Sequence, residues 1–320
     1  MTPILDVRNL SIDYLANGIA LHAVEDINFQ INKGRSLALV GESGCGKTTT
    51  MLSLLRLLPA EGRIVSGKII YAGTDLLSLS EVQMREYRWN RMAIVFQGAM
   101  NALNPVQRIS DQIAESIMRQ PHTRVSRKQA LSQVGDLIEI VGIPEDRARQ
   151  YPHQFSGGMR QRAMIAMALA CKPDILIADE PTTALDVMIQ AQILSLLQSL
   201  QRDLGLAVLL VTHDLGVVAE VCDDVLVMYG GKVAEYGTVD EIFNNPCHPY
   251  TQRLLEAFPD VNNPTAALAS IPGHPPALDE IPLGCRFEPR CHLRTEICKS
   301  VSPTARDHNP GHIVACHHAE

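Results

Sequence analysis

Residues 36–48 read SLALVGESGCGKT, and this stretch decides the fold class of the chain. Its first five residues form an apolar run of the kind found in buried parallel strands. The next eight, 41–48, match the pattern G-x-x-x-x-G-K-[ST] at every fixed position. A helical pattern follows over 48–58, so strand, glycine-rich turn and helix occur in the order that predicts a phosphate-binding loop.

The residue types of this loop explain what it can bind. Its glycines let backbone N–H groups curl around a phosphate without side-chain clash, and the helix behind them presents its positive end to the same anion. Lys47 is suited to neutralise the β- and γ-phosphates of a nucleotide, and Thr48 to offer a hydroxyl to Mg²⁺. We therefore predict ATP contacts from the loop and the first turn of its helix: Gly41, Glu42, Ser43, Gly44, Cys45, Gly46, Lys47, Thr48 and Thr49.

Composition narrows the class of protein. The chain has 320 residues, of which 46% are hydrophobic and 4% aromatic, so it can bury a large and mainly aliphatic core. Its net charge of −7 argues against nucleic acid as a partner. The N-terminus does not read as a secretory signal, and no segment approaches the about 20 apolar residues of a spanning helix. We expect a soluble chain that relies on others for any membrane crossing.

Apolar runs outline the rest of the fold. They recur at 92–96, 175–178, 207–211 and 225–229, with helical patterns between most of them, which predicts an α/β fold with a parallel sheet. Residues 5–14 alternate like an edge strand. Residues 107–170 read as an inserted helical subdomain, and beyond about 240 prolines become frequent and periodicity fades. We predict a first domain at 1–240 and an irregular C-terminal module at 241–320.

A second acidic motif follows the apolar run at 175–178. Asp179 ends that predicted strand and can hold Mg²⁺, directly or through water. Glu180 comes next and can orient or deprotonate an attacking water. A strand capped by two solvated acids is common by itself. Together with a phosphate loop, the motif indicates nucleotide hydrolysis, because that reaction needs both a phosphate cradle and a group that activates water.

Residues 155–162 read FSGGMRQR and resemble the signature motif of ABC-type ATPases, usually written LSGGQ. Phe155 and Met159 replace the usual Leu and Gln, which is similar to the form in importer ATPases for peptides and nickel. Ser156 and two glycines open a helix here and give a second N-terminal anion site. The resemblance implies that this motif faces the γ-phosphate of ATP on a partner chain, through Phe155, Ser156, Gly157, Gly158, Met159 and Gln161.

Other family elements occur in order along the chain. Gln97, after the run 92–96, resembles the Q-loop glutamine that senses Mg²⁺ and faces the membrane subunits. Asp186 closes an Ala-Leu-Asp sequence similar to the D-loop, and His213 resembles the switch histidine at the γ-phosphate. Tyr14 is the candidate for stacking on adenine, although an ordinary strand tyrosine explains it nearly as well. The resemblance thus implies a Mg²⁺ site formed by Thr48, Gln97 and Asp179. It also implies a catalytic set formed by Lys47, Glu180 and His213.

The resemblance extends to one branch of the family. The stretches NPCHPYT at 245–251, GCRFEPRC at 284–291 and ACH at 315–317 are similar to the C-terminal extension of oligopeptide and dipeptide importer ATPases. This implies a P-loop NTPase (RecA-like) core with an antiparallel β edge subdomain, an inserted helical subdomain and a Cys-rich C-terminal extension. It also implies ATP hydrolysis coupled to import of peptides or related small solutes, with nickel and oligosaccharides as alternative cargoes.

The same resemblance implies partners. The expected assembly has a second ATPase chain, two transmembrane permease subunits and an extracytoplasmic solute-binding protein, with this chain peripheral on the cytoplasmic face of the cell membrane. The branch usually pairs two different ATPases, so we expect a heterodimer, and a homodimer stays open. We expect the coupling to the permeases near Gln97 and residues 98–110. A soluble non-transport ABC ATPase, an exporter and an ATP-binding iron–sulfur sensor are the other function classes.

Four cysteines crowd into the end of the chain. Cys285, Cys291, Cys298 and Cys316, called the tail cysteines below, have the spacing C-x5-C-x6-C-x17-C. Four thiolates can hold a [4Fe–4S] cluster or a tetrahedral Zn²⁺. The resemblance implies the iron–sulfur cluster, zinc stays an alternative, and nearby histidines could replace a thiolate: His292, His317 and His318. The scattered cysteines are expected to pack in the interior, at 171, 222 and 247.

Overall fold

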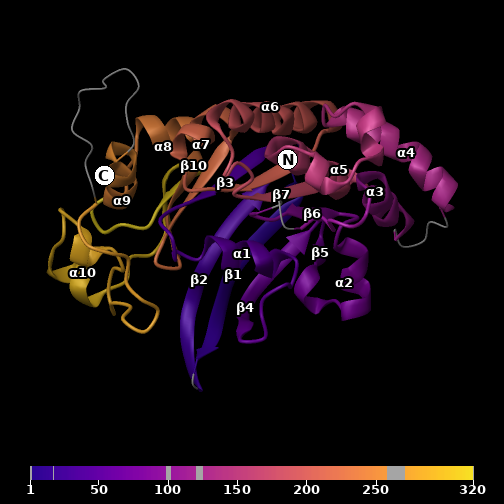
Figure 1. The fold of residues 1–320 in the computed structure, drawn as a ribbon. Helices are drawn as coiled ribbons and strands as arrows, with labels where there is room; N and C mark the ends of the chain where they lie inside the picture. The colour runs from indigo at the N-terminus through magenta and orange to yellow at the C-terminus, as the bar shows by residue number, and fades with distance from the viewer. Residues whose placement is uncertain (1, 17, 99–101, 120–124, 258–270, 320) are drawn as a thin grey trace. The chain divides into compact units, whose positions relative to one another are not determined.

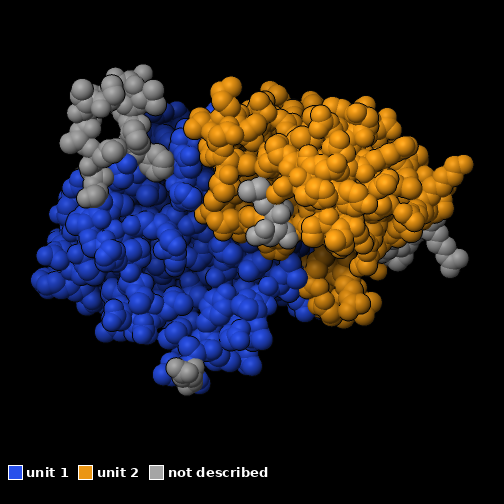
Figure 2. Space-filling model, in the orientation of Figure 1, with its two compact units in different colours: residues 1–78, 211–320 blue, residues 79–210 orange. Residues whose placement is uncertain are grey.

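The structure is a computed structural model that describes residues 2–16, 18–98, 102–119, 125–257 and 271–319. The chain divides into two units, which Figure 2 colours separately. Unit 1 comprises residues 1–78 and 211–320, and unit 2 comprises residues 79–210. Unit 1 therefore contains both the phosphate loop and the described part of the C-terminal segment.

An antiparallel sheet opens unit 1. Its strands are β1 (Leu5–Ala16), β2 (Ile19–Ile31), β4 (Gly62–Tyr71) and β5 (Thr74–Asp75), in the order β2-β1-β4-β5 (Figure 1). Leu5, Leu10, Ile12 and Ile27 are completely buried, so one face of these strands belongs to the core. This sheet is the antiparallel edge subdomain that the sequence led us to expect, but the prediction of an edge strand at residues 5–14 is wrong, because β1 pairs with β2 on one side and β4 on the other.

The second sheet of unit 1 carries the phosphate loop. Strand β3 (Ser36–Val40) is buried along its whole length and pairs in parallel with β9 (Asp224–Tyr229). Strands β10 (Lys232–Thr238), β12 (His312–Val314) and β11 (Arg306–Asn309) continue the sheet on the β9 side by antiparallel pairing. The C-terminal segment is therefore more regular than its proline content indicates, because its last strands extend the core sheet.

The helices of unit 1 are short. They are α1 (Lys47–Leu54), α7 (Leu215–Val221), α8 (Val239–Asn244), α9 (Pro249–Glu256) and α10 (Glu296–Ser300), with 3-10 turns η1 (Leu76–Ser78) and η5 (Glu288–Arg290). Helix α1 ends at Leu54, not at Leu58 as predicted. Arg56 has a left-handed φ of 53°, and the N–H of Leu57 turns back to the carbonyl oxygen of Leu52. That geometry cannot continue a right-handed helix.

Unit 2 combines three strands with most of the long helices. Strands β6 (Met92–Val95), β7 (Ile175–Asp179) and β8 (Ala207–Val211) lie in the order β8-β7-β6. The helical elements are α2 (Glu81–Tyr87), α3 (Ile109–Met118), α4 (Arg127–Ile140), η3 (Glu145–Arg149), η4 (Pro152–Gln154), α5 (Gly157–Leu169) and α6 (Val187–Leu204). Within residues 107–170, the part that the structure describes is helical or irregular and contains no strand.

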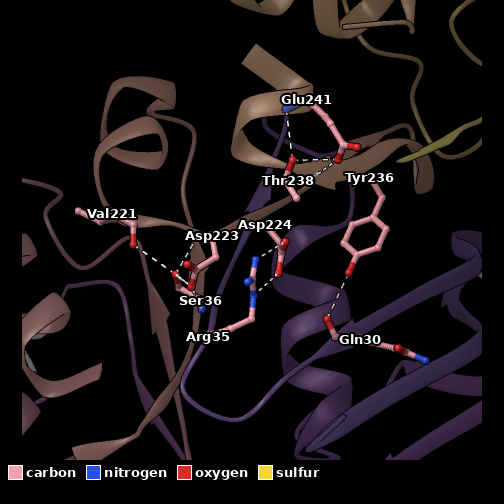
Figure 3. Close-up of polar contacts among 9 residues, drawn as sticks. All are labelled: Gln30, Arg35, Ser36, Val221, Asp223, Asp224, Tyr236, Thr238 and Glu241. Carbon is pink, nitrogen blue, oxygen red and sulfur yellow. Dashed lines mark hydrogen bonds and ion pairs between the residues drawn. The ribbon is translucent and has the colours of Figure 1, made fainter. Parts of the chain in front are cut away.

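Polar contacts tie the start of β3 to the start of β9 (Figure 3). The guanidinium of Arg35 makes two hydrogen bonds to the carboxylate of Asp224, at 2.9 and 3.1 Å. The N–H and hydroxyl of Ser36 both donate to Asp223, at 2.7 and 2.9 Å. Charge-assisted bonds of this kind are the stronger ones in proteins. They fix the strand that leads into the phosphate loop.

None of the helices in the described part of the chain is both long enough and apolar enough to cross a lipid bilayer.

Candidate active site

Three glycines of the phosphate loop have a left-handed φ, and two of them show why the loop needs glycine. Gly41 has a φ of 145°, and a Cβ there would lie 2.2 Å from the carbonyl oxygen of Met228 and 2.8 Å from the Sγ of Cys45. Gly46 has a φ of 100° and forms the N-cap of α1. Left-handed backbone of this kind strains any residue with a side chain. The pattern predicted from the sequence is therefore a steric requirement of the loop.

Lys47 and the start of α1 point their donors at the loop. The Nζ of Lys47 donates to the carbonyl oxygens of Gly41 and Glu42, at 2.6 and 3.0 Å. Among the residues that the structure describes, no side chain caps the N-terminus of α1, so its first N–H groups can bind an anion. The side chain of Thr48 is exposed in the first turn. The geometry suits a phosphate held by helix N–H groups and a lysine.

Two more predicted residues of unit 1 lie near this loop. The hydroxyl of Tyr14, on β1, is 3.4 Å from Oγ1 of Thr49, which places the ring beside the first turn of α1. His213 is exposed and follows β8. Its neighbour Thr212 donates to the carbonyl oxygen of Leu39, two residues before the loop. The structure thus brings Tyr14 and His213 to the same region of unit 1 as the phosphate loop.

In unit 2 the acidic motif and the Q-loop glutamine meet. Strands β6 and β7 pair in parallel, so the residues that follow them leave the sheet at one edge. Asp179 ends β7 and is buried. The Nε2 of Gln97 donates to Oε2 of Glu180 at 2.5 Å, and the hydroxyl of Thr183 donates to the same oxygen at 2.9 Å. The carboxylate of Glu180 is therefore held in place by two donors.

The signature stretch opens α5, as predicted. Ser156 is the N-cap, and its hydroxyl accepts a hydrogen bond from the N–H of Met159 at 3.3 Å. A Cβ on Gly158 would lie 2.5 Å from Cγ2 of Ile189, so α5 and α6 approach closely at this glycine. Asp186 caps α6 through the N–H of Ile189 at 3.0 Å. Phe155 is buried, and the amide nitrogen of buried Gln161 has no hydrogen-bond partner in the described structure.

The sequence-predicted residues thus fall into two groups, each placed within its own unit. Unit 1 holds the phosphate loop, Tyr14 and His213, and unit 2 holds Gln97, Asp179, Glu180, the signature stretch and Asp186.

The sequence reading missed two residues that contact the phosphate loop. Tyr250 and Arg290, both from the C-terminal segment, hydrogen-bond to Glu42. Each lies inside a stretch that resembles the importer branch, but nothing in the pattern indicates their partner.

The tail cysteines lie near one another in unit 1. The N–H of Cys285 donates to the carbonyl oxygen of Cys298 at 2.7 Å, and Nε2 of His318 lies 3.6 Å from the Sγ of Cys298. The N–H of His318 donates to the Sγ of Cys316 at 3.3 Å. Burial, with smaller contributions from the other three tail thiols, raises the pKa of the Cys285 thiol to about 11. Four clustered sulfurs in an environment that disfavours unpaired thiolate charge suit a cationic metal centre.

Among the described residues, Glu235, Cys247 and His312 bring three possible metal-ligand atoms within 4.8 Å of one another, and the tail cysteines do not. The Glu235 carboxylate is buried and accepts hydrogen bonds from the N–H of Cys247, the N–H of His248 and Nε2 of His312. Those donors satisfy the carboxylate without a metal, so we read the group as structural. Cys171, Cys222 and Cys247 are half-buried, and Cys222 packs against the hydrophobic core of unit 1, as predicted.

A cavity of about 510 Å³ lies elsewhere in unit 1, between β1, β2, β10 and the β11–β12 turn. Four of the charged residues that line it form two ion pairs, Arg8 with Asp6 and Arg35 with Asp224 (Figure 3 draws the second pair). The fifth, Glu241, accepts hydrogen bonds from the N–H and the hydroxyl of Thr238.

Comparisons with known proteins agree with this geometry. Residues 24–183 match the family model described as ABC transporter, and residues 234–298 match the model described as oligopeptide/dipeptide transporter, C-terminal region. The dipeptide transport ATP-binding protein DppD of Bacillus subtilis is 47% identical, over 99% of this chain and 95% of its own length. The oligopeptide transport ATP-binding protein OppD of Haemophilus influenzae is 44% identical, over 99% of this chain and 97% of its own.

Solved structures of ATP-binding cassettes are also similar to this chain. A dimeric ATP-binding cassette in a post-hydrolysis state with ADP and Pi has a TM-score of 0.65 and 25% identity, covering 73% of this chain and 98% of that one. The phosphate loop, the acidic strand end and the signature helix all lie within the residues that match the ABC transporter model. The chain is a member of the ABC transporter ATPases and carries the C-terminal region of the oligopeptide/dipeptide branch.

Proposed function

We propose that this chain hydrolyses ATP to drive the import of peptides or related small solutes, as the nucleotide-binding subunit of an ABC transporter. The observation that carries the proposal is the strand β3, glycine-rich loop and uncapped α1, with Lys47 aimed at the loop. The relatives DppD and OppD are named for dipeptide and oligopeptide transport, and they match this chain over nearly its whole length. Nickel and oligosaccharides are alternative cargoes.

Different residues of the proposed site bind the phosphates, bind Mg²⁺ and activate the attacking water. Lys47 and the N–H groups of α1 bind the β- and γ-phosphates, while Thr48, Asp179 and Gln97 would hold Mg²⁺, which would offset negative charge on the phosphates. Glu180 orients and deprotonates the attacking water, and His213 stabilises the γ-phosphate. Gln97 and Thr183 hold the Glu180 carboxylate, which supports this assignment because positioning supplies much of the catalysis in phosphoryl transfer.

We propose that the active form is a pair of ATPase chains. The N-terminus of α5, with the hydroxyl of Ser156 and the backbone of Gly157 and Gly158, contacts the γ-phosphate of ATP on the other chain, and Asp186 lies in the D-loop between the chains. The similar solved cassette is a dimer with ADP and Pi, which supports a paired machine. We expect the second chain to be a different ATPase subunit, and a homodimer is the alternative.

The remaining partners follow from the family. We propose two transmembrane permeases, docked near Gln97 and residues 98–110, and an extracytoplasmic solute-binding protein, with this chain peripheral on the cytoplasmic face of the membrane. Of that docking segment, residues 99–101 lie outside the described structure. We also propose that the ATPase domain spans residues 1–240, with its helical subdomain at 107–170, and that residues 241–320 form the C-terminal extension.

We propose that the tail cysteines hold a [4Fe–4S] cluster. The proposal is supported by the resemblance of the C-terminal segment to the importer branch, whose members carry this cysteine set as iron–sulfur ligands. Four thiolates can also hold a tetrahedral Zn²⁺, which is the alternative. The cluster would clip the C-terminal segment onto unit 1.

An absorption spectrum tests the metal assignment. Protein purified without oxygen should be brown, with broad absorption that dithionite bleaches, and should contain iron and sulfide. A colourless protein with one bound zinc would show that the tail cysteines hold Zn²⁺ and not a [4Fe–4S] cluster.

Hydrolysis is tested with the purified chain, its partner ATPase and the permeases in liposomes. Lys47→Ala should abolish ATP binding, because it removes the charge that neutralises the phosphates. Glu180→Gln should retain ATP binding but lower turnover by at least about a hundredfold. Peptide-stimulated ATPase activity and peptide uptake are the two measurements. Normal turnover in Glu180→Gln would remove Glu180 as the catalytic base, and wild-type protein that binds no ATP would contradict the proposed function.

A further inference from the structure

Glu42, inside the phosphate loop, is held by an arginine from the C-terminal segment. The two Nη atoms of Arg290 reach the two carboxylate oxygens of Glu42, at 2.6 and 3.0 Å. The Arg290 side chain is only 5% exposed and that of Glu42 is 26% exposed. This two-pronged geometry between guanidinium and carboxylate fixes direction as well as distance.

The guanidinium of Arg290 is itself fixed by its surroundings. Its Nε donates to the carbonyl oxygen of Pro272 at 2.8 Å, and Nη1 donates to the hydroxyl of Tyr229 at 3.2 Å. Its Cζ lies 5.7 Å from the centre of the Tyr229 ring, within the range of a cation–π contact. Because its donors and one face are occupied, Arg290 is an anchored group and not a flexible surface side chain.

The backbone of the loop is held from the same side. The N–H of Glu42 donates to the hydroxyl of Tyr250 at 2.9 Å. Tyr250 is completely buried and packs against Tyr229 and Phe287, with ring centres 4.6 and 5.3 Å away. Both the backbone and the carboxylate of Glu42 therefore depend on residues that lie more than 180 positions later in the chain.

A second arginine supports the opposite end of the loop. Arg286 donates to the carbonyl oxygen of Gly230 and forms an ion pair with Glu25. The N–H of the next residue, Gly231, donates to the carbonyl oxygen of Cys45 at 3.0 Å. Arg286 and Arg290 both lie in the segment 285–291, so this one segment supports the loop at two places.

We propose that Arg290 is a positioning residue for ATP binding, which holds the phosphate loop in its binding shape through Glu42. The inference rests on the proposed nucleotide site at this loop. Three of the six residues at 41–46 are glycines with left-handed φ, so the loop has much conformational freedom to lose when it closes on a phosphate. An anchor that removes that freedom beforehand strengthens binding without touching the ligand.

The test compares ATP affinity in the full chain, measured by calorimetric titration of Mg²⁺–ATP. Arg290→Gln should raise the Kd about tenfold, a coupling of ordinary size between two sites. Glu42→Gln should have a similar effect. The double variant should bind no more weakly than either single variant, because each change breaks the same contact. Arg290→Lys should recover part of the affinity, since an ammonium keeps the charge but not the two-pronged geometry.

A matched control and a second variant separate positioning from folding. Arg294→Gln removes an exposed arginine four residues along the chain, whose one ion-pair partner among the described residues is Glu288 at 3.9 Å, and should leave the Kd unchanged. Tyr250→Phe removes one hydroxyl and keeps the ring packed. It should also weaken ATP binding, because the N–H of Glu42 loses its acceptor. If Arg290→Gln does not fold, the Kd values of Tyr250→Phe and Glu42→Gln still test the proposal.

A further readout is the split between KM and kcat in the assembled transporter. Positioning of the loop predicts a KM for ATP raised about tenfold with kcat within about twofold of wild type. Unchanged Kd and KM in Arg290→Gln, or independent additive losses in the double variant, would overturn the inference. Wild-type protein that binds no ATP, or Lys47→Ala that binds normally, would instead contradict the proposed site itself.

Discussion

The carbonyl oxygen of Met228 lies where a side chain on residue 41 would begin. The loop can therefore adopt this shape only because residue 41 has no Cβ. The same position also has a φ of 145°, which L side chains rarely adopt. At the scale of the residue, the glycine pattern read from the sequence is explained by two independent constraints, one steric and one conformational.

Gly41→Ala should destabilise the protein by at least about 3 kcal/mol, because the backbone of β9 must move to admit the methyl group. Gly205→Ala is the matched control. Gly205 also has a left-handed φ, 62°, but a Cβ there meets nothing within 4 Å, so the change should cost only about 1 kcal/mol of strain. Urea denaturation followed by circular dichroism measures both. Equal losses in the two variants would show that φ alone, and not the Met228 contact, requires glycine at 41.

At the scale of the element, α5 and α6 touch through Gly158 and Ile189. Gly158→Ala should cost about 1–3 kcal/mol, because the new Cβ would lie 2.5 Å from Cγ2 of Ile189. Adding Ile189→Ala removes that methyl group and should recover most of the loss, although Ile189→Ala alone is destabilising. Thermal unfolding of the two single variants and the double variant measures the coupling. Simple additivity in the double variant would rule out the helix contact as the cause.

The elements predictable from sequence are those whose signal is local. Strands β3, β7 and β8 are buried along their length, so they read as apolar runs. The pairing of Gln97 with Glu180 also follows, because parallel strands that precede both residues end at one edge. Strand β11 has four exposed residues and no apolar alternation, so it gives no signal.

Long-range contacts explain what the sequence could not predict. Strand β12 is fixed by pairing with β10 and by the bond from His312 to Glu235, 77 positions earlier. The contact of Arg290 with Glu42 spans 248 positions. A periodicity or a motif relates residues that are close along the chain. Both of these contacts join residues that are far apart along it, so no local pattern predicts them. The phosphate-loop motif could be predicted from the sequence, but the contacts by which the C-terminal segment holds the loop could not.

At the scale of the whole molecule, a buried histidine links stability to pH. Burial lowers the pKa of His248 to about 4, below its ordinary value of about 6.5. Its Nδ1 accepts a hydrogen bond from the N–H of Tyr250 at 3.0 Å, which requires that nitrogen to be unprotonated. Between these pH values the unfolded chain binds the proton and the folded chain does not. Stability is therefore present above about pH 6.5 and is lost as the pH falls toward about 4.

The expected loss from His248 is about 2 kcal/mol between about pH 7 and about pH 5. His248→Asn keeps an oxygen that can cap α9 but removes the titration, so its loss over the same range should be smaller by about that amount. Urea denaturation at the two pH values, for wild type and variant, gives the difference and cancels other titrating groups. Identical pH dependence in both proteins would mean that His248 stays neutral in the unfolded chain as well, or is solvated in the folded one.

The distance along the chain between Glu42 and Arg290 also has a consequence for synthesis. A ribosome makes residue 290 only after 248 further residues, which takes roughly ten to fifty seconds at about 5–20 residues per second. Throughout that interval the nascent polypeptide has its glycine-rich turn but not the guanidinium that steadies it. Prematurely terminated products would share this defect, so they would compete poorly with finished molecules for cellular ATP.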